Sequence, residues 1–462
     1  MTFFFGWSKL LKKVDDPSED PMLRIVLFSL LLPLLAWNDE WSLDHAIVSI
    51  YAVDTSTGNV LLEKNSDLSV TPGSCMKIVT TGAALHLLGP KMRFQTHLEY
   101  DGQIDEEHVL HGNVYIRGGG DPCLGSDRIA GSRSWESQID SWCEAVQSLG
   151  IRVIVGEVIG DDSKWERALA VPSWLWEDLG NHYGSGASAL SFHENTYSLS
   201  FTPGKKVGEK TTLLTVEPPL PRLEVHNEVL TGPKGTGDRA CIYGSEFSWV
   251  KTVRGTIPAG APEFAIKGAI PDPALVVADL LQLELQKRGI AVHHQKVVPQ
   301  KRVVIHTTDS PTIADIVHLT NQKSTNLYAE HLCKKMGETM LQEGSTAAGV
   351  VSATQFWDSQ GLDLAGFQMV DGSGLSRKNL LTTAQLVQIL LKMKQSPFFS
   401  IFFDSLPQRS PSIRAKSGTM SLVKGMAGYA GNVAFAMVVN HCPSMSAMNE
   451  KVEHLLMQLE QE

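Results

Sequence analysis

Pro72-Gly-Ser-Cys-Met-Lys77 opens a long apolar segment of this 462-residue chain. The apolar run continues as far as Leu88, contains no acidic residue and is ended by Gly89-Pro90. Such a run predicts a helix that begins near Ser74 and is buried inside a domain. Lys77 follows Ser74 by one turn on the same helix face, so its amine can reach the serine hydroxyl. Because burial lowers the pKa of a lysine, the neutral amine could take the serine proton and activate the oxygen.

Two further motifs lie downstream of Ser74 and Lys77. Without them, Ser74 would be interpreted as a helix cap and Lys77 as a surface lysine. Two consecutive helices are predicted after residue 309, the first of them opened by Ser310-Pro311. Ser324-Thr-Asn326 falls in the short loop between these helices. Residues two apart in such a loop can both face one cleft, which makes Ser324 and Asn326 candidates for the same site.

The third motif, Lys416-Ser-Gly-Thr419, lies on the first of three predicted antiparallel strands, at 412–419, 422–430 and 432–440. Gly418 would let a substrate approach the strand edge closely, and Lys416 would place a fixed positive charge there. Each motif is common by itself. In this order, on a helix start, a loop and a strand, S-x-x-K, S-x-N and K-[ST]-G form the serine acyltransferase signature of β-lactamases and penicillin-binding proteins.

The chain resembles the class C low-molecular-mass penicillin-binding proteins, the D-alanyl-D-alanine carboxypeptidase/endopeptidase group, over roughly residues 45–440. Ser74 and Ser324 are 250 residues apart (324 − 74), and a large insert at this place marks the group. Asp371-Gly-Ser-Gly-Leu-Ser-Arg377 matches a characteristic segment of the group. Gly119-Gly-Asp-Pro122 and Pro172-Ser-Trp174, followed by Tyr183, resemble its insert.

The resemblance implies an α+β fold, with a transpeptidase-like catalytic domain built on a five-stranded antiparallel sheet flanked by helices. We expect the catalytic domain at 39–95 and 271–462, and one or two inserted β-rich domains at 96–270. If there are two, one is nested at about 111–184. Residues 1–38 would form an N-terminal extension with a signal peptide or anchor.

The resemblance also implies the activity of a serine D-Ala-D-Ala carboxypeptidase on peptidoglycan stem peptides, and it leaves a D,D-endopeptidase activity open. It further implies a role for each motif residue. Ser74 would be the acylated nucleophile and Lys77 its general base. Ser324 would relay a proton toward the leaving group, and Asn326 would hold the substrate amide. The terminal carboxylate would bind at the K-[ST]-G strand, whose residues are Lys416, Ser417, Gly418 and Thr419. The N–H groups of Ser74 and Thr419 would form the oxyanion hole, and β-lactams would acylate the enzyme as inhibitors.

The chain departs from the group's pattern at two positions, and the first of them concerns recognition of the substrate's free amino end. Group members that favour diaminopimelate often carry an aspartate three residues before Pro-x-Trp, where this chain has Leu169. Ser417 replaces the commoner threonine but keeps the hydroxyl. Arg377 is retained, at the end of a loop rich in glycine and serine. We hypothesise that Arg377 grips the side-chain carboxylate of a diaminopimelate residue, the alternative being that it pins its own loop.

Two rival functions are a β-lactamase and a catalytically inactive peptidoglycan-binding protein. No E-x-x-L-N deacylation motif lies between Ser74 and Lys416, and a binding role would not need Lys77. The net charge of −10 argues against a nucleic-acid partner. Phosphate loops and H-E-x-x-H helices are absent from the sequence, so no metal or cofactor is expected.

The N-terminus predicts export to the periplasm. Arg24 precedes a 13-residue apolar run, Ile25–Trp37, which suits a signal peptide better than a membrane span. Met22 could be the true start, and an uncleaved anchor, the only membrane contact expected, is an alternative. The six cysteines allow 15 disulfide connectivities, although Cys75 and Cys333 are expected to be buried thiols inside helices.

Overall fold

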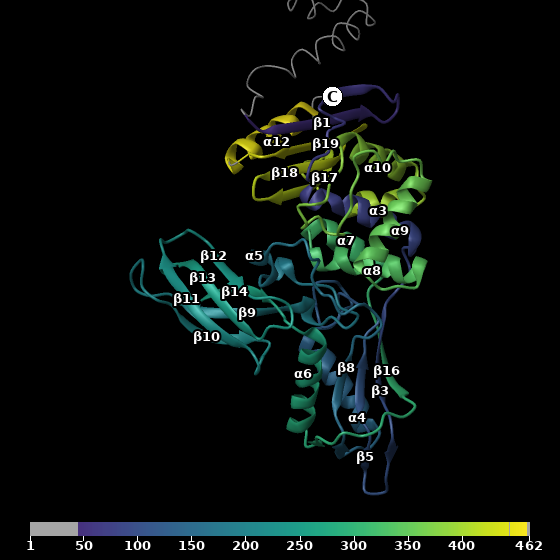
Figure 1. The fold of residues 1–462 in the computed structure, drawn as a ribbon, viewed down its shortest axis with the longest axis vertical. Helices are drawn as coiled ribbons and strands as arrows, with labels where there is room; N and C mark the ends of the chain where they lie inside the picture. Colours follow the sequence, from purple (N-terminus) through teal and green to yellow (C-terminus); the bar gives the residue numbers. More distant parts are fainter. Residues whose placement is uncertain (1–44, 443, 460–462) are drawn as a thin grey trace, which may run out of the picture.

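The structure of the chain, a computed structural model, describes residues 45–442 and 444–459 (Figure 1). The predicted extension and signal or anchor at 1–38 lie outside these residues. In the part of the chain that is described, no helix combines the length and apolar character that crossing a membrane requires. All six cysteines fall within it and are unpaired, with Cys75 and Cys333 buried as predicted.

A five-stranded sheet joins the two ends of the described chain. Its strands are β17 (Ile413–Met420), β18 (Val423–Ala430), β19 (Val433–Asn440), β1 (Ile47–Asp54) and β2 (Val60–Lys64), in that order. Every neighbouring pair is antiparallel. The predicted antiparallel sheet and the α+β fold class are therefore confirmed.

Each face of this sheet is covered by helices, as the alternation of side chains along the strands requires. Phe435 and Met437 of β19 pack with α12 (Met445–Leu459) in one core. Ala434 and Ala436, on the other face, belong to the core that holds α3 (Met76–Leu87) and α10 (Thr383–Gln395). Figure 1 shows α12 on one side of the sheet and α3 and α10 on the other.

Helix α3 is the centre of the larger core, and its first ten residues are all buried. It contacts α7 (Ile313–Lys323), α8 (Asn326–Leu341), α9 (Thr346–Ser359) and α10. The buried helix predicted from the sequence is confirmed. Its start differs in one respect, because Ser74 lies in a 3-10 turn, η2 (Gly73–Cys75), that precedes the first α-helical residue.

The insert forms a second core with four smaller sheets. Two four-stranded sheets form the lower lobe in Figure 1, from β3 (Gln95–Tyr100), β4 (Gln103–Ile104), β5 (Val109–His111), β6 (Val114–Arg117), β7 (Val153–Val155), β8 (Val158–Asp161), β15 (Ala291–His293) and β16 (Val303–Asp309). Two three-stranded sheets form the lobe at its left, from β9 (Thr196–Thr202), β10 (Thr212–Glu217), β11 (Glu224–Gly232), β12 (Arg239–Tyr243), β13 (Val250–Pro258) and β14 (Phe264–Ala269). The remaining helices are α4 (Trp135–Ser148), α5 (Trp176–Leu179), η3 (His182–Gly184), η4 (His193–Asn195), α6 (Pro273–Lys287) and α11 (Phe399–Ser405).

Elements on both sides of residue 270, the boundary predicted for the insert, pack in the second core. Helix α6 packs on α4 and β8, and its buried leucines belong to the second core. Strand β16 pairs with β3, so the chain returns to the first core only after Asp309. The lobe of β9–β14 follows the segment 111–184, for which a nested domain was predicted. Hydrophobic periodicity locates a helix but does not say which core its apolar face covers. The domain division itself stays a prediction.

Candidate active site

Lys77 is the best-connected residue of the site, and its side chain is completely buried. Its Nζ lies 3.0 Å from Ser74 Oγ, 2.6 Å from Asn326 Oδ1 and 2.6 Å from the carbonyl oxygen of Ser373. The structure thus brings the S-x-x-K serine and lysine together with the S-x-N asparagine.

These contacts suit a neutral amine at Lys77. Burial lowers the pKa of Lys77 well below its usual range, and the nearby charge of Lys416 lowers it further. A neutral amine has two N–H donors and one lone pair. The oxygens of Asn326 and Ser373 can only accept, so they take both donors. The lone pair is then left for the hydroxyl hydrogen of Ser74, which is the contact that a general base needs.

Ser74 is placed by a close approach between its turn and strand β17. A Cβ added to Gly418 would stand 2.4 Å from the carbonyl oxygen of Pro72 and 3.0 Å from the Ser74 nitrogen. Gly73 itself has a φ of +53°, a left-handed conformation that favours glycine. Gly418 thus lets the strand pack against the nucleophile's own turn. The expectation that Gly418 also leaves room for a substrate at the strand edge stays a prediction.

Ser324 lies between α7 and α8 with a φ of +56°, an uncommon conformation for a serine. Such strained residues persist where the surrounding structure holds them, and they cluster at functional sites. The Ser324 hydroxyl is 2.8 Å from Lys416 Nζ, which also donates to the carbonyl oxygen of Ser417 at 2.7 Å. Burial lowers the pKa of Lys416 to about 8. The second and third motifs therefore meet in one contact.

Asn326 links the site to the insert. While its Oδ1 accepts from Lys77, its Nδ2 donates to the carbonyl oxygen of Tyr183 in η3 at 2.8 Å. Ser74, Ser324 and Asn326 are all half-buried, which leaves their polar atoms within reach of a ligand. The insert thus forms part of the wall of the site.

Glu330 is a site residue that the motif search missed. From α8, its Oε1 accepts from the Ser373 nitrogen at 2.7 Å and its Oε2 from the Gly372 nitrogen at 3.1 Å. Glu330 therefore holds Ser373, the residue whose carbonyl oxygen accepts from Lys77. Burial, with the nearby Asp371, raises the pKa of Glu330 to about 7. Its position one helical turn after Asn326 is the signal that could have found it.

Asp371 fixes the rest of this loop and ties it to the insert. Its carboxylate accepts from the nitrogens of Gly374 and Ser376 and from the indole of Trp174 at 2.8 Å. Ser173 and Ser376 meet through their hydroxyls at 2.6 Å. The Pro-Ser-Trp segment and the Asp371–Arg377 segment, both noted in the sequence for separate reasons, therefore bind each other.

The remaining predicted residues lie at the edge of the site. Arg377 donates from Nη1 to the carbonyl oxygen of Ser421 at 3.1 Å, in the turn between β17 and β18. Ser417 Oγ accepts from Arg409 at 3.0 Å, and Thr419 is exposed. Leu169 is buried and offers no carboxylate. Within the described residues no cluster of three or more His, Cys, Asp or Glu side chains could hold a metal.

A comparison with protein-family models decides the family. Residues 36–460 match the D-Ala-D-Ala carboxypeptidase 3 (S13) family. The chain belongs to this family. It is a serine-type D-Ala-D-Ala carboxypeptidase, and the predicted family and enzyme class are confirmed over the β-lactamase and inactive-protein alternatives.

Similar proteins agree with this assignment. A D-alanyl-D-alanine carboxypeptidase of Actinomadura sp. (strain R39) is 27% identical over 438 residues, covering 87% of this chain and 79% of that protein. The carboxypeptidase DacB of Haemophilus influenzae is 22% identical over 85% of both chains. The crystal structure of penicillin binding protein 4 (dacB) from Haemophilus influenzae has a TM-score of 0.77 at 20% identity, covering 90% of this chain and 97% of that one. The chain therefore has the same fold as penicillin binding protein 4 of Haemophilus influenzae.

Proposed function

We propose that this D-Ala-D-Ala carboxypeptidase uses Ser74 as its nucleophile and Lys77 as the general base, through an acyl-enzyme. The contact between Lys77 Nζ and Ser74 Oγ carries the proposal, because the other two partners of Lys77 are acceptors that leave its lone pair to the serine. Release of D-alanine from an acyl-D-Ala-D-Ala peptide tests it. Prior treatment with penicillin should stop that release, and undiminished release would contradict the proposal.

In the acylation step, Ser74 Oγ attacks the carbonyl carbon of the penultimate D-alanine while Lys77 takes the hydroxyl proton. The N–H groups of Ser74 and Thr419 stabilise the oxyanion, a contribution whose loss typically costs ~10²–10³ in rate. The C–N bond breaks as the leaving D-alanine receives a proton. Ser324 relays that proton, and water then hydrolyses the ester.

The substrate is bound by residues of strand β17 and by Asn326 at the start of α8. Lys416 binds the terminal carboxylate, aided by Ser417 and Thr419 on β17. Asn326 Nδ2 exchanges its bond with the Tyr183 carbonyl for the substrate amide. That exchange keeps the asparagine satisfied in both states, so substrate binding costs little at this residue.

We further propose that the substrates are peptidoglycan stem peptides, that D,D-endopeptidase cleavage of cross-links accompanies the carboxypeptidase, and that β-lactams acylate Ser74. The penicillin binding protein 4 of Haemophilus influenzae has been solved in a complex with a β-lactam, which supports the last point. We also propose export to the periplasm, where peptidoglycan lies. Cell fractionation checks this, since a full-length chain confined to the cytosol would contradict it.

The pH dependence of kcat/KM should fall on its alkaline side near pH 8. Lys416, whose pKa is about 8, carries its positive charge below that pH and loses it above, so binding of the substrate carboxylate weakens as pH rises. On the acid side the rate should rise as Lys77 becomes neutral, at a pH below the ordinary range of lysine. A peptide amide without the terminal carboxylate is the control. An identical alkaline fall with the amide would contradict the role of Lys416.

Arg377→Ala should lower kcat/KM for diaminopimelyl peptides by roughly 10–100-fold, the loss expected for one charged hydrogen-bonded contact. We propose that its guanidinium leaves the Ser421 carbonyl to bind the side-chain carboxylate. Simple acyl-D-Ala-D-Ala peptides and penicillin acylation should change little. Lys378→Ala, which removes the neighbouring exposed charge, is the matched control. Equal losses on every substrate would mean that Arg377 only pins its loop to the β17–β18 turn.

A further inference from the structure

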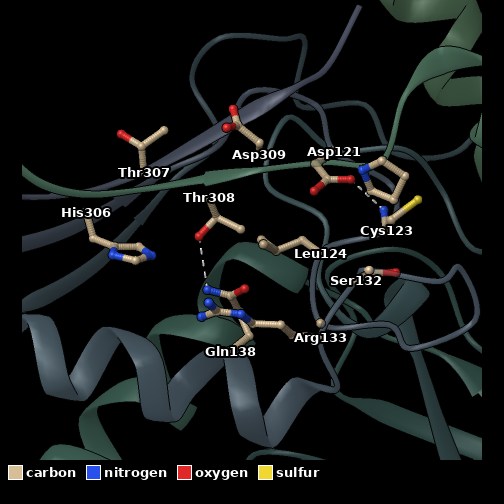
Figure 2. A pocket seen from close by; sticks show the side chains of 13 residues that line it. Asp121, Cys123, Leu124, Ser132, Arg133, Gln138, His306, Thr307, Thr308 and Asp309 are labelled. Carbon is tan, nitrogen blue, oxygen red and sulfur yellow. Dashed lines mark hydrogen bonds between the residues drawn. The ribbon is translucent and has the colours of Figure 1, made fainter. Parts of the chain in front are cut away.

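A cavity lies between the two cores, away from the active site, and it shares no lining residue with the site around Lys77. Its volume is about 210 Å³. The walls are the loop of residues 121–133, α4 and the end of β16 (Figure 2). Since a water takes ~30 Å³, the space equals roughly seven waters and is smaller than the ~300–1,000 Å³ typical of drug-sized ligands. It suits a molecule of amino-acid size.

One end of this cavity is acidic. Asp121 is 3% exposed, and the hydrogen bond made by its carboxylate is to the Cys123 nitrogen at 2.7 Å. Its Oδ2 has no partner among the described residues. Burial raises the pKa of Asp121 to about 7, the sign of a carboxylate poorly compensated by its surroundings. A buried polar group with free acceptor capacity beside a cavity calls for a donor from a ligand or water.

The opposite end is cationic. Figure 2 shows the side chains of Arg133 and His306 at the end of the cavity away from Asp121. Arg133 forms neither an ion pair nor a hydrogen bond with any described residue. Burial lowers the pKa of His306, and the charge of Arg133 lowers it further. Gln138, which is buried, donates to Thr308 Oγ1 at 3.1 Å and fixes the floor beside the guanidinium. The unpaired guanidinium of Arg133 and the carboxylate of Asp121 therefore line the same cavity.

We propose that this cavity binds a free α-amino acid as a zwitterion, with its ammonium on Asp121 and its carboxylate on Arg133. An ammonium supplies donors to the under-satisfied carboxylate, and a guanidinium can bind a carboxylate through two parallel hydrogen bonds. The reaction of this family supplies such a molecule. Hydrolysis of the terminal D-Ala–D-Ala bond adds water across the C–N bond and frees D-alanine with a new ammonium. The cavity is thus a product site separate from the catalytic serine.

Binding of D-alanine to the full chain tests the proposal, measured by titration calorimetry or ligand-observed NMR. Arg133→Ala should weaken binding by about tenfold or more, the loss expected for a charged hydrogen-bonded contact. It changes an exposed side chain, so the fold should not suffer. Asp121→Asn should weaken binding similarly, and Asp127→Asn, an exposed acid on the same loop, is its matched control. Ethylamine and propionate, each with one of the two charges, should bind more weakly than D-alanine.

A Lys416→Ala variant separates this cavity from the catalytic site. Binding of D-alanine that survives Lys416→Ala and is lost in Arg133→Ala supports the second site. Binding that is lost in Lys416→Ala and kept in Arg133→Ala places the amino acid at the catalytic serine and overturns the proposal. An absence of D-alanine binding also overturns it, without touching the roles of Ser74 and Lys77.

Discussion

Ser74→Ala is expected to reduce D-alanine release by about 10⁴-fold or more, because removing a nucleophile eliminates the covalent route and leaves only binding effects. The variant removes one half-buried hydroxyl, whose partner is Lys77. Fold and stability should therefore change little. Release of D-alanine from an acyl-D-Ala-D-Ala peptide, followed with the purified protein, measures the loss.

Ser69→Ala is the matched control for that experiment. Ser69 is exposed on the segment that leads into the site, and its hydroxyl donates to the carbonyl oxygen of Gly366. We expect this variant to keep full activity. A Ser74→Ala protein that still released D-alanine at the original rate would show that another residue is the nucleophile.

Lys77→Met should lower the rate of penicillin acylation by about 10²–10⁴-fold, the range for loss of a general base. Methionine keeps most of the buried volume, but Asn326 Oδ1 and the Ser373 carbonyl lose their donor. Each orphaned acceptor costs about 1–3 kcal/mol of stability, so the melting temperature should also fall. Stopped-flow measurement of the second-order acylation rate constant separates the chemical effect from the structural one.

Lys334→Met provides a control whose structural cost is at least as large, because Lys334 also forms an ion pair with Glu166 at 3.3 Å. Lys334 is another fully buried lysine of the catalytic core, and it donates to the carbonyl oxygens of Ala168 and Ala187. Its replacement should also lower the melting temperature while leaving the acylation rate constant nearly unchanged. If the two variants lost acylation equally, Lys77 would be acting through stability and not as a base.

The motif residues could be predicted because their spacing is tied to local structure. Lys77 follows Ser74 by three positions, about one helical turn, and Asn326 follows Ser324 by two positions, which keeps both side chains in one short loop. The contacts of Lys77 with Ser74 and of Lys416 with Ser324 follow from those placements once the fold is formed. Whether each residue plays the chemical role proposed for it stays a prediction.

The rest of the site depends on contacts that no local pattern contains. Tyr183 offers a backbone carbonyl to Asn326, and any residue type could do so at that position. Glu330 binds two backbone nitrogens of a loop some forty residues later, and its place one helical turn after Asn326 does not reveal those partners. The assignment of the segment after residue 270 to one core or the other was beyond the sequence for a similar reason. Helix α6 has the periodicity of a helix on either core, and only the assembled structure places it on the second.

The most direct test of the central claim is the intact mass of the unmodified protein after incubation with a labelled penicillin. We predict a gain of one penicillin equivalent, located by peptide mapping on the segment that contains Ser74. An adduct on a different residue, or the complete absence of an adduct in folded protein, would contradict the account.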